Sequence, residues 1–134
     1  MNIRLASYSA SKVLRHITVA LFLLSLLLTG IVTTHETMPG WIVLMLGWMG
    51  PLEKNFAWYA NLPFAYALLL SKKSTVGSRV VLFYGFLLAL SAFRLKVIHY
   101  DAGGNDVIRL GTGYYLWLLS FVTLFASLQL KKSD

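Results

Sequence analysis

The chain has 134 residues, a net charge of +7 and no cysteine, and its composition suits lipid better than water. Hydrophobic residues make up 57% and charged residues 13%, whereas a soluble domain has roughly 45–50% and about 25%. The lack of cysteine excludes disulfides, thiolate zinc sites and thiol nucleophiles. The basic residues form short clusters between apolar runs, which is typical of membrane-flanking anchors and argues against nucleic-acid binding.

Four apolar runs predict four membrane spans. A spanning helix needs about 20 residues, so each run is extended into its flanks. The first run could be a signal peptide, but no small-x-small cleavage site follows it, which favours a retained helix. We therefore expect an all-α fold, an integral membrane four-helix bundle that forms one domain over residues 1–134. Its expected spans are residues 13–34, 55–71, 77–98 and 111–130.

The connection after the first span contains a short apolar segment at about residues 40–50. Trp41 and Trp48 are seven residues apart, so a helix would place both on one face. This spacing favours an interfacial helix that lies at the headgroup level between spans 1 and 2. The alternative is the first half of a long second span, but Glu53 and Lys54 would make burial of that span costly.

The second span contains an amide and a proline. Pro63 is expected to free the carbonyl of Tyr59 and to kink the helix. Asn61 would be costly in lipid unless it bonds another helix or the freed backbone. We favour Asn61 as a structural link between helices, and the alternative is a polar lining for a small pocket.

Two histidines, His35 and His99, follow the first and third spans. At similar depth they could ligate haem or a metal, with Asp101 or Glu36 as a third ligand. The favoured alternative is that both are interfacial anchors, so we expect no cofactor. The turn-rich connection that contains Asp101 and Asp106 lacks the closing glutamate of a calcium loop.

The last span opens with glycines and aromatic residues. Gly111 and Gly113 permit close approach of another backbone. Aromatic side chains are expected to gather at the same membrane surface, where they would contact a partner. These interface residues are Trp41, Trp48, Trp58, Tyr114, Tyr115 and Trp117.

Two segments carry a resemblance to known proteins. The run from Ala57 to Asn61, Ala-Trp-Tyr-Ala-Asn, and the Gly-x-Gly-Tyr-Tyr-Leu-Trp entry to the last span resemble a group of small bacterial inner-membrane proteins without an established activity. Those proteins show a Trp-x-Ala-Asn-Pro run, from which this chain departs by placing Leu62 before Pro63. The resemblance implies a four-helix inner-membrane fold.

The distribution of basic residues predicts the topology. Eight of the twelve Lys and Arg residues lie in the amino terminus, the connection 71–79 and the carboxyl tail. Because Lys and Arg are enriched in cytoplasmic loops, both termini are expected in the cytoplasm of a bacterial cell, with the spans in the inner (plasma) membrane.

The span interiors offer little for chemistry. They contain no acidic residue, and Ser25, Ser91 and Ser120 have no histidine near their depth, so we expect no enzyme. The favoured function is binding of another membrane component, either as an accessory subunit of a membrane complex or as an immunity protein against a membrane-targeting toxin. The partner would be a membrane protein or a second copy of the chain. The alternative is a small oligomeric transporter or channel for an anion, with Asn61, Arg94 and Arg109 along the path.

Overall fold

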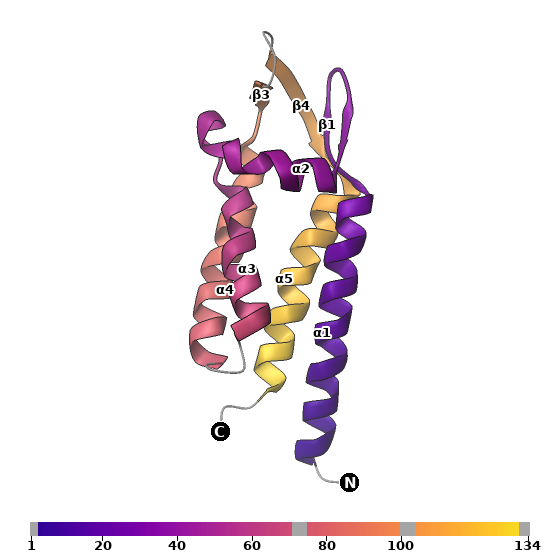
Figure 1. Cartoon of the computed structure of the whole chain (residues 1–134), viewed down its shortest axis with the longest axis vertical. Coiled ribbons are helices and arrows are strands. Elements are labelled where there is room, and N and C mark those ends of the chain that lie inside the picture. The colour runs from indigo at the N-terminus through magenta and orange to yellow at the C-terminus, as the bar shows by residue number, and fades with distance from the viewer. Residues whose placement is uncertain (1–2, 71–74, 100–103, 132–134) are drawn as a thin grey trace.

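Helices dominate the fold, and a small antiparallel sheet lies at one end of them (Figure 1). The computed structural model describes residues 3–70, 75–99 and 104–131. The α-helices are α1 (Ile3–Leu27), α2 (Gly40–Leu46), α3 (Asn61–Leu70), α4 (Thr75–Leu90) and α5 (Thr112–Leu130). The 3₁₀ helices are η1 (Gly47–Glu53), η2 (Ala57–Ala60) and η3 (Ser91–Arg94). The strands are β1 (Thr29–Thr33), β2 (Thr37–Pro39), β3 (Val97–His99) and β4 (Gly104–Leu110).

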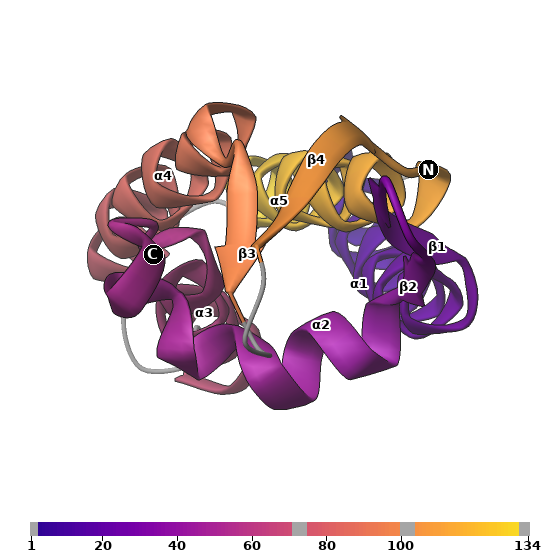
Figure 2. The same cartoon turned by 90° about the horizontal axis from the view of Figure 1, so that it is seen from above.

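The four longer helices form two pairs that stand side by side (Figure 1). Helix α1 packs along α5, and α3 packs along α4. Both chain ends lie at the end of the molecule opposite the sheet. Helix α2 runs across the sheet end, from the α1–α5 pair to the α3–α4 pair (Figures 1 and 2). The connection that contains α2 therefore joins the two pairs.

Small residues at heptad spacing bring α1 and α5 together. A seven-residue repeat returns to the same face of a helix and supports side-by-side packing, and small side chains let two backbones approach in lipid. We call these residues the α1–α5 seam, and each of them is buried. The seam consists of Ser11, Thr18 and Ser25 on α1 and of Gly113, Ser120 and Ser127 on α5.

Hydroxyl groups bond the two helices of the seam. Ser11 Oγ donates to the carbonyl oxygen of Ser127, and Ser127 Oγ donates to that of Ser11, each at 2.9 Å. Closer to the sheet along the same pair of helices, the hydroxyls of Thr18 and Thr123 lie 2.8 Å apart. These reciprocal bonds satisfy polar groups that lipid could not solvate, and they fix the register of the pair.

An aromatic cluster connects the two helix pairs. Phe64 of α3 stacks on Phe22 of α1 with ring centroids 5.3 Å apart, and it contacts Phe121 of α5 at 4.9 Å. Phe64 and Phe121 are both buried. The hydrophobic core at mid-length therefore includes residues of both pairs.

Two arginines cap helices at the end that holds the termini. Arg15 of α1 donates to the carbonyl oxygen of Leu68 in α3. Arg79 of α4 donates to the carbonyl oxygen of Leu128 in α5 at 2.9 Å. A positive charge at a helix C-terminus satisfies open carbonyls and complements the helix dipole, so these contacts stabilise the ends of α3 and α5.

The sheet continues the α1–α5 pair beyond its helices. Its strand order is β2-β1-β4-β3, and every neighbouring pair is antiparallel. Strand β1 follows α1 and strand β4 precedes α5. Ile31 lies opposite Leu110, and Gly111 N donates to Gly30 O at 2.8 Å. The two helices and the two strands therefore form one continuous antiparallel ribbon.

The expected all-α four-helix bundle is wrong, because the chain contains this four-stranded sheet. Residues assigned to the end of the first span form β1, and residues assigned to the end of the third span form most of β3. The connections that follow these two spans form β2 and β4. The missed signal is β-branched composition, as in Ile31-Val-Thr33 and Val107-Ile108. A hydropathy average assigns such residues to a membrane-spanning segment, because it measures polarity and not backbone conformation.

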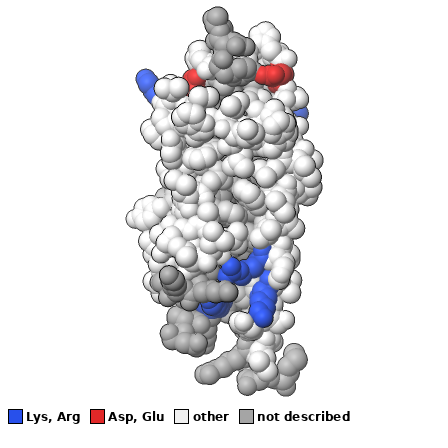
Figure 3. Space-filling model, viewed as in Figure 1, with Lys and Arg blue, Asp and Glu red and all other residues white. Residues whose placement is uncertain are grey.

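Three helices are long and apolar enough to span a membrane: Leu5–Leu27, Val76–Arg94 and Thr112–Leu130. Helix α3 has ten residues and is not among them, so the fourth span stays a prediction. The face in Figure 3 shows a broad band without charged side chains between Lys and Arg near one end and a mixture of acidic and basic residues near the other. This distribution is compatible with association of the chain with a membrane.

We expect Ser127→Leu to separate α1 from α5. Overpacking a buried position costs about 1–3 kcal/mol, and the bond that the Ser127 hydroxyl donates to the Ser11 carbonyl oxygen is lost as well. The free energy of unfolding, measured by SDS titration of the detergent-solubilised protein, should fall by about 2 kcal/mol. Val122→Leu, on the exposed face of α5, is the matched control and should unfold like the wild type. Equal stability of the two variants would contradict the seam.

Candidate functional site

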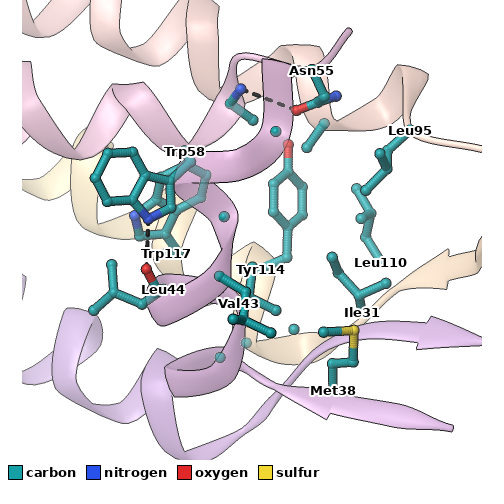
Figure 4. Close-up of a pocket in the computed structure, with 18 of the residues that line it drawn as sticks. Ile31, Met38, Val43, Leu44, Asn55, Trp58, Leu95, Leu110, Tyr114 and Trp117 are labelled. Carbon is teal, nitrogen blue, oxygen red and sulfur yellow. Dashed lines mark hydrogen bonds between the residues drawn. The ribbon is translucent and has the colours of Figure 1, made fainter. Parts of the chain in front are cut away.

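A cavity of about 190 Å³ lies at the sheet end of the molecule, between the two helix pairs (Figure 4). Strands β1 and β2 contribute Ile31 and Met38, α2 contributes Val43 and Leu44, and β4 contributes Leu110. A cavity of about 150 Å³ with apolar walls stays dry and binds benzene. The volume is therefore sufficient for an apolar group of at least that size.

Glycines at both ends of α2 hold this helix against the cavity. A Cβ on Gly40 would clash with the Ser25 carbonyl at the end of α1, and the Gly40 N–H donates to Leu28 O at 2.8 Å. A Cβ on Gly47 would clash with the Trp58 ring. The close approach of α2 to both helix pairs therefore depends on these two missing side chains.

Gly111 and Gly113 lie against the last residues of α1 and its continuation into β1. A Cβ on Gly111 would clash with the carbonyl oxygen of Thr29, and one on Gly113 would lie 2.7 Å from that of Ser25. Gly113 also lines the cavity. The close backbone approach expected from these glycines thus occurs within the chain, between α5 and α1.

Two polar side chains in the cavity wall are bonded within the protein. Asn55 Nδ2 donates to Ser91 O at 2.9 Å, and its Oδ1 accepts from the backbone N–H of Ala57 at 3.0 Å. Trp58 Nε1 donates to Leu44 O at 2.7 Å and so connects η2 with α2 (Figure 4). The hydrogen-bonding atoms of both side chains are engaged, and their carbons remain available to face the cavity.

Asn61, Tyr114 and Trp117 in the wall also form hydrogen bonds within the protein. Asn61 Nδ2 donates to Trp58 O at 2.8 Å, and Asn61 Oδ1 accepts from Trp117 Nε1 at 3.0 Å. The Tyr114 hydroxyl donates to Ala89 O at 2.8 Å. Asn61 therefore bonds another helix and also lines the cavity, which combines the two roles considered for it.

Pro63 is the third residue of α3 and not the middle of a long helix. Proline is tolerated in the first turn, where its missing N–H has no intrahelical partner. Its ring lies against α4 at Gly85, where a Cβ would be 2.6 Å from Pro63 Cγ. Pro63 therefore follows closely on the end of η2 at Ala60 and does not interrupt a continuous helix as expected.

A hydrogen-bonded pair of side chains joins two elements at the cavity. Both Glu53, at the end of η1, and His99, in β3, line it. His99 Nδ1 donates to Glu53 Oε2 at 2.9 Å, and the His99 backbone N–H donates to Oε1 at 2.8 Å. The His99 side chain is 61% exposed and that of Glu53 is 17% exposed, so the pair marks the boundary between cavity and water. The bond from the His99 side chain lowers the pKa of Glu53 below its ordinary value of 4.5, against the opposing effect of burial.

The structure divides the expected aromatic interface into two groups. Trp58, Tyr114 and Trp117 line the cavity. Trp41 on α2 is 50% exposed and Trp48 on η1 is 57% exposed. Tyr115 on α5 is exposed as well. A common partner surface for all six residues is therefore not formed.

The structure does not bring His35 and His99 together as ligands of a haem or a metal. His35 is exposed between β1 and β2, and His99 pairs with Glu53. Asp101 lies outside the described residues. Within the described part of the chain, no three His, Asp or Glu side chains come together.

The wall residues Ile31, Met38, Val43 and Leu110 were not singled out from the sequence. They come from four separate segments, and nothing in an apolar residue distinguishes a cavity wall from a membrane span. One available signal was Trp117 together with Asn61, since a buried indole N–H requires an acceptor and Trp117 Nε1 donates to Asn61 Oδ1.

Comparisons with protein-family models, with curated proteins and with solved structures found no match to this chain. The resemblance to small bacterial inner-membrane proteins therefore stays a prediction.

We expect Glu53→Gln to flatten the acid limb of the stability profile. Because the pKa of Glu53 is lower in the folded state, the ionised carboxylate stabilises the fold above about pH 4.5, and this contribution disappears as the pH falls through the lower, folded pKa. An exposed pair contributes about 0–1 kcal/mol. The melting temperature of the wild type should exceed that of the variant at pH 6 and converge with it near pH 3.

The matched control for this prediction is Glu36→Gln, because Glu36 is exposed between β1 and β2. Its melting profile should remain parallel to that of the wild type across the same range. A constant difference between wild type and Glu53→Gln would show that the His99 pair does not act through ionisation of Glu53.

Proposed function

We propose that this chain is a non-enzymatic polytopic membrane protein that acts by binding another membrane component, and that the bound component is apolar, such as a lipid chain. The observation that supports this is the cavity, whose wall is mostly aliphatic and aromatic. Among its polar side chains, Asn55, Trp58, Asn61, Tyr114 and Trp117 are already bonded within the protein, and Glu53 and His99 pair with each other at the rim. A ligand with many polar groups would lose its bonds to water there and find few new ones, whereas an apolar chain loses none.

The position of the cavity supports access from a bilayer. Helix α2 lies across the spans at the sheet end (Figure 1). Its outer surface exposes Trp41 and Met45, and Trp48 of η1 continues the same stripe. Aromatic and apolar side chains in this arrangement favour the interface between headgroups and hydrocarbon. The cavity, directly behind α2, would then lie at the depth of the upper acyl chains.

Lipid binding is compatible with both roles expected for the protein. As an accessory subunit or an immunity protein, it would present the outward aromatic stripe to a membrane-protein partner. The transporter or channel alternative has no observation in its favour. Arg94 and Arg109 are exposed and do not line the cavity, and the Asn61 amide is engaged at both ends.

We further propose that the sheet faces the outside of a bacterial inner membrane and that both termini are cytoplasmic. The chain has no cysteine, so single cysteines report the topology directly. Asp106→Cys should react with an impermeant maleimide on intact spheroplasts, and Lys12→Cys should react only after lysis. Both positions are exposed in the fold. Reaction of both from the same side would contradict this topology.

Filling the cavity should prevent ligand binding. In a Trp41→Phe, Trp48→Phe background, the two remaining tryptophans, Trp58 and Trp117, both line the cavity. A chain-brominated alkane added to the detergent-solubilised protein should quench their fluorescence, because bromine quenches only at contact. Val43→Phe should strongly reduce this quenching, since Val43 points into the cavity (Figure 4).

Met45→Phe is the matched control. It introduces the same side chain on the same helix, but at a position that is 66% exposed. Quenching in this variant should equal that of the background protein. If Val43→Phe and Met45→Phe are quenched alike while both remain folded, the alkane reaches the tryptophans from the micelle and the cavity is not a binding site.

A further inference from the structure

We infer that the ligand is an amphiphile with a hydrogen-bond-donating head, an amine or a hydroxyl, which bonds to Glu53 while its chain fills the cavity. This inference rests on the proposed function and adds the chemistry of the head. It follows from the charge of the cavity wall, the free capacity of one carboxylate and the position of that carboxylate at the rim.

The charge of the wall is negative at a single place. Among the described residues that line the cavity, Glu53 is the one acidic side chain, and neither lysine nor arginine occurs. The lysines closest in sequence to Glu53 and His99, Lys54 and Lys96, are exposed and do not belong to the wall. Water and salt screen such exposed charges, so the wall favours a cationic or neutral head over an anionic one.

The Glu53 carboxylate retains capacity for a further donor. A carboxylate offers about four acceptor positions. His99 uses Oε1 through its backbone N–H at 2.8 Å and approaches both oxygens through Nδ1, at 3.0 and 2.9 Å. Within the described part of the chain, Oε2 accepts from His99 Nδ1 alone, so a second donor can bind to it without breaking the pair.

The position of Glu53 suits the boundary that an amphiphile needs. Its side chain is 17% exposed, and it lies between the exposed His99 and the apolar wall. A head at Oε2 therefore stays close to water, while the attached chain extends toward Val43 and Trp58. His99, through both of its bonds, acts as a positioning residue for the carboxylate.

The test compares three probes with the same brominated chain: a primary amine, a carboxylic acid and the headless alkane. Tryptophan quenching is measured in the Trp41→Phe, Trp48→Phe background at pH 7. A hydrogen bond to a charged group contributes about 1.5–3 kcal/mol, so the amine should bind about tenfold or more tightly than the acid. Glu53→Gln should remove most of this preference. Glu53→Asp, which keeps the charge, should retain part of it, and the exposed Glu36→Gln should retain all of it.

The outcomes separate the inference from the proposed function. If alkane quenching is insensitive to Val43→Phe, the cavity does not bind chains and both fail. If alkane quenching depends on Val43 but amine and acid bind equally, only the inference about the head is overturned. The same holds if Glu53→Gln leaves the amine preference intact. If Glu53→Gln also loses alkane binding, the inference about the head is tested by the comparison of amine with acid in the protein that retains Glu53.

Discussion

The close approach of α1 and α5 is the constraint on which the other features depend. Helices with large side chains at their contact lie 8–10 Å apart, whereas hydrogen-bonded strands lie about 4.8 Å apart. The small residues of the α1–α5 seam and the glycines at its sheet end bring the backbones of the two helices closer together, toward the spacing of paired strands. Gly111 can then bond Gly30 directly, so the helix pair passes into the β1–β4 ladder without an intervening loop. A wider helix pair would cost β1 and β4 the hydrogen bonds that they make with each other.

The cavity follows from the way the second helix pair is attached. Helices α3 and α4 meet the first pair through the aromatic cluster around Phe64 and through the Arg15 contact to Leu68. At the sheet end, the space between the pairs is bridged by α2, which has no fully buried residue. A short helix lying across two pairs cannot fill the volume beneath it. Indole and amide groups around that volume bond to one another and to the backbone, so the wall remains apolar.

The polar boundary of the cavity depends on the sheet. Strand β3 carries His99 to the end of η1, and the β3–β4 register, in which His99 lies opposite Gly104, holds it there. Glu53 is thereby kept ionised and oriented where an apolar wall meets water. The fold thus places the Glu53 carboxylate at a depth where a head could bond it and a chain could continue inward. This arrangement is the basis of the functional proposal, and it arises from elements outside the candidate spans.

The sequence by itself determined the apolar character of the chain, the three long helices and the special role of Gly111 and Gly113, because hydropathy and the lack of a Cβ are properties of single segments. The heptad spacing of Ser11, Thr18 and Ser25 was also present, but its meaning required knowledge of which helix lies opposite. Only the tertiary structure decided the strands, since Ile31 gains its β conformation from Leu110, far along the chain. It also decided the partner of Asn61 and the cavity itself. A cavity is the space that several segments leave between them, and no single segment encodes it.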